Sequence, residues 1–398
     1  MNEENTNDLE YLLPIEIREI PANRRYWFVR TFGGKLFDYY YEKGRVGISG
    51  NSVPVELIKN AKHDNVTFES LQNNILKNIF PEKPGEATKL ANQLVDFYHN
   101  MQVGDIVLMP SENSDYIAFG EVTSDMKLIA SSARPTFYHN DKLEEYPQKS
   151  RNVKWLKIMS KRDVVGDLRN LFSTHMGLTN ADQYADFIEG NLSTFFLKDD
   201  QYFSTLCIDL NEDQDLNAFE LSRYLEALTK LYEDVCISNG IEYNEELYLK
   251  IKVQSAGNLI LKVKKGAKSA GKTIGKVASG GLVIGFLGMV ALSVAGADPT
   301  VEFSRKADGS IDFKAGIKGN IFENVQNAKD REQERDTKRT KDSLEIEEKK
   351  YAQFLNRKSN GTLTEEDRIK YGNQMVDSAR ALNMSSIESK SVKKEDID

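Results

Sequence analysis

The sequence predicts an α+β protein made of several modules, and three observations lead to that fold class. Short runs of aromatic and β-branched residues end at glycine- and proline-containing turns, as strands do. Other stretches carry apolar residues at helical spacing. One long apolar segment stands out from an otherwise ordinary chain of 398 residues, of which 40% are hydrophobic and 29% charged. A chain of this length holds about two or three domains.

The expected N-terminal domain, residues 23–198, follows an acidic, polar lead of residues 1–22 that we expect to be disordered. Strands are predicted at residues 26–30, which end at a pair of glycines, and at residues 45–50. Between them lies the aromatic run 37–41. Strand alternation would send at least one of its tyrosine rings inward as packing.

Helical patterns follow, and strands then return. Residues 55–80 are polar with helical spacing, and residues 89–99 carry apolar side chains on one face, as in an amphipathic helix. Strands are predicted at residues 104–110, 115–122 and 153–158. Residues 161–198 carry apolar residues at helical spacing, so we expect helices to complete this domain.

A smaller α+β module is predicted at residues 205–265. Its helix has leucines on one side, and residues 247–253 and 259–263 alternate as the two strands of a hairpin. A second β-hairpin is expected within residues 298–322, where an Asp-Gly pair marks the turn. Residues 323–398 are rich in both charge signs, which predicts a charged helical or disordered tail, disordered from residue 385 onward.

The most unusual stretch is the glycine-rich segment, residues 266–297. Its C-terminal part carries no charged or amide side chain, and a helix of that length could cross the hydrocarbon core of a bilayer. Small residues recur four apart, at Gly271 and Gly275 and again at Gly281 and Gly285, and such faces let helices approach closely. The pattern resembles the glycine zippers of membrane-active proteins. We expect membrane contact and a homo-oligomer formed through this helix; a buried helical hairpin in a soluble domain is the alternative.

The bulk composition argues against several function classes. A net charge of −8 does not fit a protein that coats nucleic acid through a broadly basic surface. Two cysteines fit a reducing cytoplasm, and the four histidines show no zinc-ligand spacing. The sequence shows no nucleophile with a base at plausible spacing, no metal-ligand cluster and no phosphate-loop motif, so we predict no cofactor, no metal and no catalytic activity. The acidic N-terminus is not a signal peptide, so we expect a cytoplasmic protein that reaches the inner membrane only through the glycine-rich segment.

Several motifs between residues 24 and 190 together resemble one family. They are Trp-x-Val-Arg from Trp27, Gly-Asp-Ile-Val from Gly104, Gly-Glu from Gly120 and Arg-x-Val-Lys-Trp from Arg151. The family is the EVE-like domain of the PUA superfamily, found at the N-terminus of Mrr-type and related modification-dependent restriction proteins. One departure is Ser49-Gly50-Asn51, at a place where that family often carries Gly-Trp.

The resemblance implies a compact β-barrel with a pocket that holds a modified, flipped-out base. Such a pocket needs aromatic faces for stacking and fixed polar groups for the base edge. The candidate ligand-binding residues are Trp27, Arg30, Tyr39, Tyr41, Ser49, Asn51, Ser111, Arg151 and Trp155. The tryptophans are alternatively part of the barrel core, and the arginines are alternatively solvated surface groups.

These features predict a non-enzymatic, bacterial antiviral defence protein. The EVE-like domain would sense a modified nucleic acid or nucleotide, and the glycine-rich segment would then act on the membrane. The alternative is a soluble subunit that recognises modified DNA and recruits a separate nuclease through its charged C-terminal arm. A third reading, a hydrolase with an unrecognised site, stays open because active sites assemble from residues distant in sequence.

Overall fold

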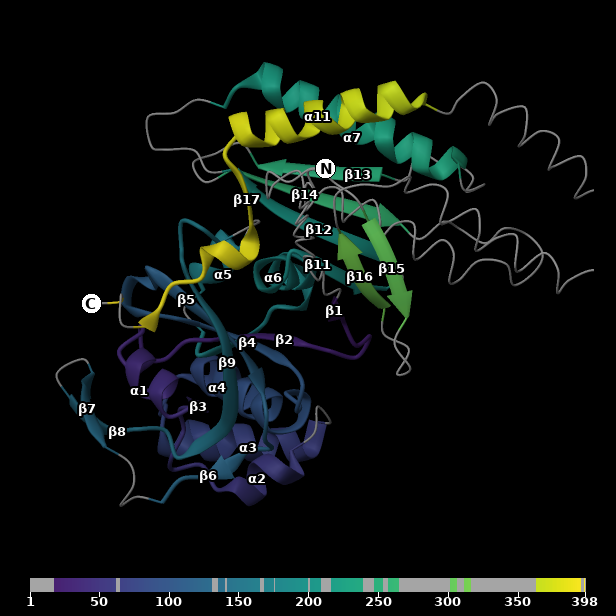
Figure 1. Ribbon diagram of the computed structural model, residues 1–398. Helices are drawn as coiled ribbons and strands as arrows, with labels where there is room; N and C mark the ends of the chain where they lie inside the picture. Colours follow the sequence, from purple (N-terminus) through teal and green to yellow (C-terminus); the bar gives the residue numbers. More distant parts are fainter. Residues whose placement is uncertain are drawn as a thin grey trace, which may run out of the picture. The chain divides into compact units, whose positions relative to one another are not determined.

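In the structure, a computed structural model, the described residues cover most of the chain up to residue 264 and its C-terminal end (Figure 1). They are residues 18–61, 65–130, 135–139, 142–164, 168–174, 176–199, 201–208, 216–238, 247–252, 257–264, 301–305, 311–315, 363–394 and 397. The glycine-rich segment, with Gly271, Gly275, Gly281 and Gly285, lies outside these ranges. Within them, no helix is long and apolar enough to span a membrane.

The chain divides into two compact units. The N-terminal unit comprises residues 21–192 and 388–398, and the second unit comprises residues 1–20 and 193–387. The division after residue 192 places strand β11 (Phe195–Lys198) in the second unit, whereas the sequence extends the N-terminal domain to residue 198.

The N-terminal unit is built on a curled, half-barrel sheet in a mixed α+β fold. Its strand order is β10-β2-β4-β5-β9-β3, and β6 pairs with β9. The strands are β2 (Tyr26–Val29), β3 (Arg45–Ile48), β4 (Ile106–Pro110), β5 (Tyr116–Val122), β6 (Lys127–Leu128), β9 (Lys149–Ser160) and β10 (Leu178–Asn180). β2 and β4 run parallel, and the other pairs are antiparallel.

Strand β9 produces the curl because it pairs with two different neighbours along its length. Residues 153–160 pair with β5, and residues 149–152 pair with β3. The register shifts between Phe119 and Gly120, so Leu156 is the extra residue of a β-bulge, which bends a strand and increases its twist. Gly120 is suited to this position because a Cβ there would lie 2.6 Å from the Trp155 ring.

Helices complete the core of this unit. They are α1 (Phe37–Glu42), α2 (Val55–Asn60), α3 (Asn65–Asn78), α4 (Pro84–Val95), α5 (Arg169–Phe172) and α6 (Ala185–Leu192). α4 continues as the π-helix η1 (Asp96–Asn100), and two short 3₁₀ turns are η2 (Glu112–Ser114) and η4 (Asp182–Tyr184). Buried side chains of α2, α3 and α4, such as Ile58, Leu71 and Leu94, join the strand residues in one apolar cluster. A separate hairpin consists of β7 (Thr136–His139) and β8 (Lys142–Glu145).

The second unit contains a sheet of order β1-β11-β12-β14-β13, with β17 also paired to β12. Besides β11, its strands are β1 (Arg18–Glu19), β12 (Gln201–Ile208), β13 (Leu247–Lys252), β14 (Gly257–Lys264) and β17 (Met384–Ser386). Strands β15 (Val301–Arg305) and β16 (Ile311–Ala315) pair antiparallel, in the stretch where the sequence predicts a hairpin.

Two long helices of the second unit, α7 (Ala218–Ser238) and α11 (Glu365–Ala381), are joined by a buried ion pair. The Asp234 carboxylate, 1% exposed, accepts hydrogen bonds from Arg368 Nε at 2.7 Å and from the Leu363 amide at 2.8 Å. The end of the predicted charged tail is therefore folded onto α7. The 3₁₀ turn η5 (Ile387–Lys390) follows β17.

The aromatic run 37–41 is helical, so the strand alternation expected for it is wrong, whereas the expected inward packing of at least one tyrosine ring is confirmed by Tyr40. α1 buries Phe37 and Tyr40, which are three residues apart and share one helix face. Aromatic residues are compatible with either state, and tertiary packing decides between them here.

Three further predictions differ from the structure. Residues 161–198 include two helices, but also strands β10 and β11. The lead, expected to be disordered to residue 22, contains β1, which pairs with β11. Residue 392, within the predicted disordered end, donates its amide to Ile158 O at 2.9 Å and so lies on β9. In the last two cases, backbone hydrogen bonds to distant residues place segments that the sequence analysis expected to be disordered.

Candidate functional site

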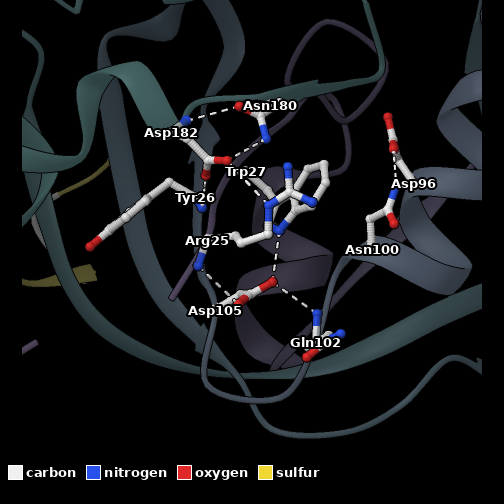
Figure 2. Close-up of polar contacts among 9 residues, drawn as sticks. All are labelled: Arg25, Tyr26, Trp27, Asp96, Asn100, Gln102, Asp105, Asn180 and Asp182. Carbon is white, nitrogen blue, oxygen red and sulfur yellow. Dashed lines mark hydrogen bonds and ion pairs between the residues drawn. The ribbon is translucent and has the colours of Figure 1, made fainter. Parts of the chain in front are cut away.

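Trp27 is a core residue and does not present a stacking face. It is fully buried in β2, and its Nε1 donates to Asp105 Oδ2 at 2.9 Å (Figure 2). The same carboxylate accepts hydrogen bonds from the backbone amides of Arg25 at 3.1 Å and Gln102 at 2.8 Å. Asp105 thus ties the start of β2 to the turn before β4, and Trp27 is part of the apolar core, as the alternative interpretation expected.

A second carboxylate fixes the other side of β2. Asp182 accepts the Tyr26 amide at 2.8 Å, Arg25 Nε at 3.2 Å and Asn180 Nδ2 at 2.8 Å (Figure 2). The Arg25 guanidinium lies 5.0 Å from the centre of the Trp27 ring. Because these charged groups bind one another and the backbone, the network positions strands rather than offering open contacts to a ligand.

Arg151 is also structural. Its side chain is buried and donates to three carbonyl oxygens, those of Phe97 at 2.9 Å, Tyr98 at 3.0 Å and Ser124 at 3.0 Å. Two of these carbonyls belong to the π-helix that ends α4, where a helix leaves acceptors without intrahelical donors. Burial lowers the pKa of Arg151, and the nearby Asp125 and Asp105 oppose that shift. Arg151 therefore caps a helix, and it is neither solvated nor free to read a base.

Four half-buried rings form what we call the aromatic row: Phe32, Phe137, Tyr146 and Tyr39. Phe32 and Phe137 lie 5.0 Å apart, Phe137 and Tyr146 lie 5.1 Å apart, and Tyr146 and Tyr39 lie 4.4 Å apart, all edge to face. The Arg45 guanidinium lies 5.4 Å from the centre of the Tyr39 ring. The rings come from the turn after β2, from α1, from β7 and from the segment before β9, so the fold gathers them from four places.

The loop after β3 holds Tyr146 in this row. Asn51 donates to Tyr146 O at 3.2 Å and accepts the Gln148 amide at 2.7 Å. Lys149 Nζ donates to the carbonyl of Gly50 at 2.7 Å, which fixes the same loop. Asn51, predicted as a polar ligand contact, instead binds the backbone on both sides of Pro147. Partial burial and the neighbouring Tyr39 raise the pKa of Tyr146.

Tyr41 and Trp155 form a separate stack. Their rings lie 5.6 Å apart at 20°, and Trp155 Nε1 donates to Tyr40 O at 3.3 Å. Phe37 stacks on Tyr41 at 6.2 Å. Tyr39 and Tyr41 are two residues apart on a helix, so they point to different faces. The structure therefore divides the predicted aromatic set, with only Tyr39 in the row.

Two other predicted polar residues, Arg30 and Ser111, bind the main chain, Arg30 at a distant carbonyl and Ser111 within a local turn. Arg30 donates to Phe172 O at 2.5 Å, and Ser111 Oγ accepts the Tyr116 amide at 2.9 Å. Ser49 is half-buried just after β3. Four residues of the site, Phe32, Arg45, Phe137 and Tyr146, were not predicted from the sequence. The available signals were the aromatic pair Phe137-Tyr138 and the Tyr146-Pro147 step in an otherwise polar stretch. Within the described residues, no group of three or more His, Cys, Asp or Glu side chains is placed to hold a metal.

By its fold and site, the N-terminal unit is an α+β domain with a half-buried aromatic row beside a curled sheet. The family model described as "Domain of unknown function (DUF8426)" matches residues 36–175. The matched range begins just before α1 and ends after α5, and it includes Tyr39, Phe137 and Tyr146 of the row. Neither curated proteins nor solved structures give a significant match to the chain.

Proposed function

We propose that the N-terminal unit binds a modified base or nucleotide at the aromatic row, and that this binding controls an action of the glycine-rich segment on the membrane in antiviral defence. The observation that carries the proposal is the row itself. Four rings from separate elements converge while remaining half-buried, and Arg45 lies over the ring at one end. The rings pack against the apolar core while part of each ring stays open to solvent.

The chemistry of the row suits a flat heteroaromatic ligand. A base stacked on an aromatic side chain gains about 1–3 kcal/mol, and the stack tolerates different bases because each has a π-face. Arg45 can add a cation–π contact or pair with a phosphate. The resemblance of the sequence to EVE-like domains of the PUA superfamily, together with the curled sheet, supports a base over other flat ligands.

The membrane part of the proposal rests on sequence alone. Small residues four apart, such as Gly271 and Gly275, favour close helix packing and therefore a homo-oligomer in a bilayer. Cells should be fractionated with and without the ligand. In the presence of the ligand, the chain should sediment with the membranes and resist extraction by carbonate. A chain that stays in the supernatant under both conditions would favour the alternative, a soluble subunit that recruits a nuclease.

Ligand binding is tested on the full chain. Calorimetric titration should use a panel of methylated and hydroxymethylated adenine and cytosine nucleotides, both free and within oligonucleotides. Tyr146→Ala should weaken binding by about 5- to 150-fold, which corresponds to the loss of one stacked ring. Tyr138→Ala is the matched control because this ring is 69% exposed on the same hairpin region and lies outside the row. If no member of the panel binds the wild type, the proposed function fails.

A further inference from the structure

Tyr40 carries a buried hydroxyl with no hydrogen-bond partner among the described residues. The side chain is 1% exposed and projects from α1, between Tyr39 of the row and Tyr41 of the second stack. Buried hydroxyls are normally hydrogen-bonded. In the unfolded chain a hydroxyl hydrogen-bonds to water, so burying it without a partner destabilises the folded state. An unpaired group of this kind in a folded protein calls for an explanation.

The hydroxyl lies beside the aromatic row. A Cβ added to Gly47 of β3 would be 2.4 Å from Tyr40 Oη and 3.0 Å from Pro147 Cβ. The absence of a side chain at Gly47 therefore lets the phenol reach the space next to Pro147, the residue that follows Tyr146. The rings of Tyr39 and Tyr40 are 5.7 Å apart, so the phenol and the row are neighbours.

Segment 146–148, whose Pro147 lies near this hydroxyl, is held by polar contacts at its two ends, including the Ile129 backbone amide, which donates to Gln148 O at 2.8 Å. Asn51 binds the carbonyl of Tyr146 and the amide of Gln148, and the Tyr146 amide donates to Pro135 O at 3.1 Å. Pro147 itself has no amide hydrogen to donate. A shift of this segment by the thickness of a ring would open the Tyr40 hydroxyl to a ligand stacked in the row.

We propose that Tyr40 determines ligand specificity: when a heteroaromatic ligand enters the row, the segment 146–148 shifts and the Tyr40 hydroxyl hydrogen-bonds to a nitrogen or oxygen on the ligand's edge. This inference rests on the proposed function and adds the group that distinguishes one ligand from another by a hydrogen bond. The ligand class is thereby narrowed to planar rings with a polar edge. A site built to hydrogen-bond such an edge rejects analogues that lack it, because its own polar group then stays unpaired.

The test is Tyr40→Phe, which removes only the oxygen. Binding of the nucleotide that the wild type binds best in the panel should fall by about tenfold or more, whereas the thermal midpoint should stay equal or rise. Tyr138→Phe is the control, because it removes an exposed hydroxyl from a ring outside the row. Equal affinity of Tyr40→Phe and wild type, with Tyr146→Ala still weakened, would overturn this inference and leave the proposed function standing.

A second measurement does not depend on the variant being well folded. The wild type is titrated with nucleotide analogues in which one edge group at a time is replaced by carbon or hydrogen. At least one analogue should bind the wild type about tenfold more weakly than the parent nucleotide does. Uniform affinity of the wild type for all analogues would overturn the assignment. Failure of every nucleotide to bind the wild type would instead refute the proposed function.

Discussion

Replacing Arg151 with methionine separates the two roles that this residue could have. The structure gives it a buried guanidinium that donates to three main-chain carbonyls. Each hydrogen bond from a charged donor contributes about 1.5–3 kcal/mol net, but methionine also removes the desolvation cost of the cation. The free energy of unfolding should therefore fall by about 3–5 kcal/mol, because three buried carbonyls lose their donors at about 1–3 kcal/mol each and the relieved desolvation offsets part of that loss.

Urea unfolding followed by tryptophan fluorescence measures this change in the right part of the chain. The only two tryptophans, Trp27 and Trp155, both lie in the N-terminal unit. The thermal midpoint should drop by about 2–4 °C per kcal/mol for a domain of this size. Arg162→Met is the matched control, because this arginine is exposed on the turn after β9 and its loss should change stability by less than about 0.5 kcal/mol. An Arg151→Met variant as stable as wild type, but weakened in ligand binding, would refute the helix-capping role and restore the predicted ligand contact.

Two further predictions concern the second unit and the buried phenol. Asp234→Ala should destabilise the second unit by about 3 kcal/mol, because Arg368 and the start of α11 lose a buried acceptor; urea unfolding by circular dichroism should show this loss but no change for the exposed control Asp377→Asn. Burial raises the pKa of Tyr40 well above the ordinary value of 10.0, Tyr39 and Tyr146 add smaller increases, and the nearby Arg45 opposes them. The folded state therefore keeps the phenol proton longer than the unfolded state, and stability should fall as the pH rises above about 10. Tyr40→Phe should show a shallower fall over that range, and parallel curves for the two proteins would contradict this expectation.

The sequence predicted those elements whose pattern is local. The amphipathic helix near residue 90 and the strands at 104–110 and 115–122 follow from apolar spacing and turn residues, and the structure contains α4, β4 and β5 there. The run 37–41 was misread because tyrosines at consecutive positions fit a strand and a helix equally well. Only the packing of Phe37 and Tyr40 on one face distinguishes the two.

The candidate site was less predictable because it is made by contacts between distant residues. Tyr39 and Tyr146 are far apart in sequence, and nothing in either neighbourhood indicates that their rings meet. Arg151 was assigned to a ligand on its motif, but its three partners are backbone carbonyls, which leave no trace in a sequence. Trp27 was assigned to the ligand in the same way. Its partner Asp105 lies in a turn, where an aspartate is common for local reasons, so the sequence does not indicate that it binds a buried tryptophan.

Side chains on one face of β9 hold both the end of α4 and the elements that carry the aromatic row. Odd-numbered residues from 149 to 155 share one face of the strand, while Asn152 and Lys154 are exposed on the other. On the shared face, Lys149 holds the carbonyl of Gly50 and Arg151 holds the end of α4.

On the same face, Trp155 holds α1 by stacking on Tyr41 and by donating to Tyr40 O. The bulge at Leu156 then resets the alternation, so Lys157 is buried and donates to Asn191 O at 3.1 Å. A one-residue slip of β9 would turn every one of these anchors to the opposite face. The position of the aromatic row is therefore set by the register of β9, although only Tyr146 of the row lies next to that strand in sequence.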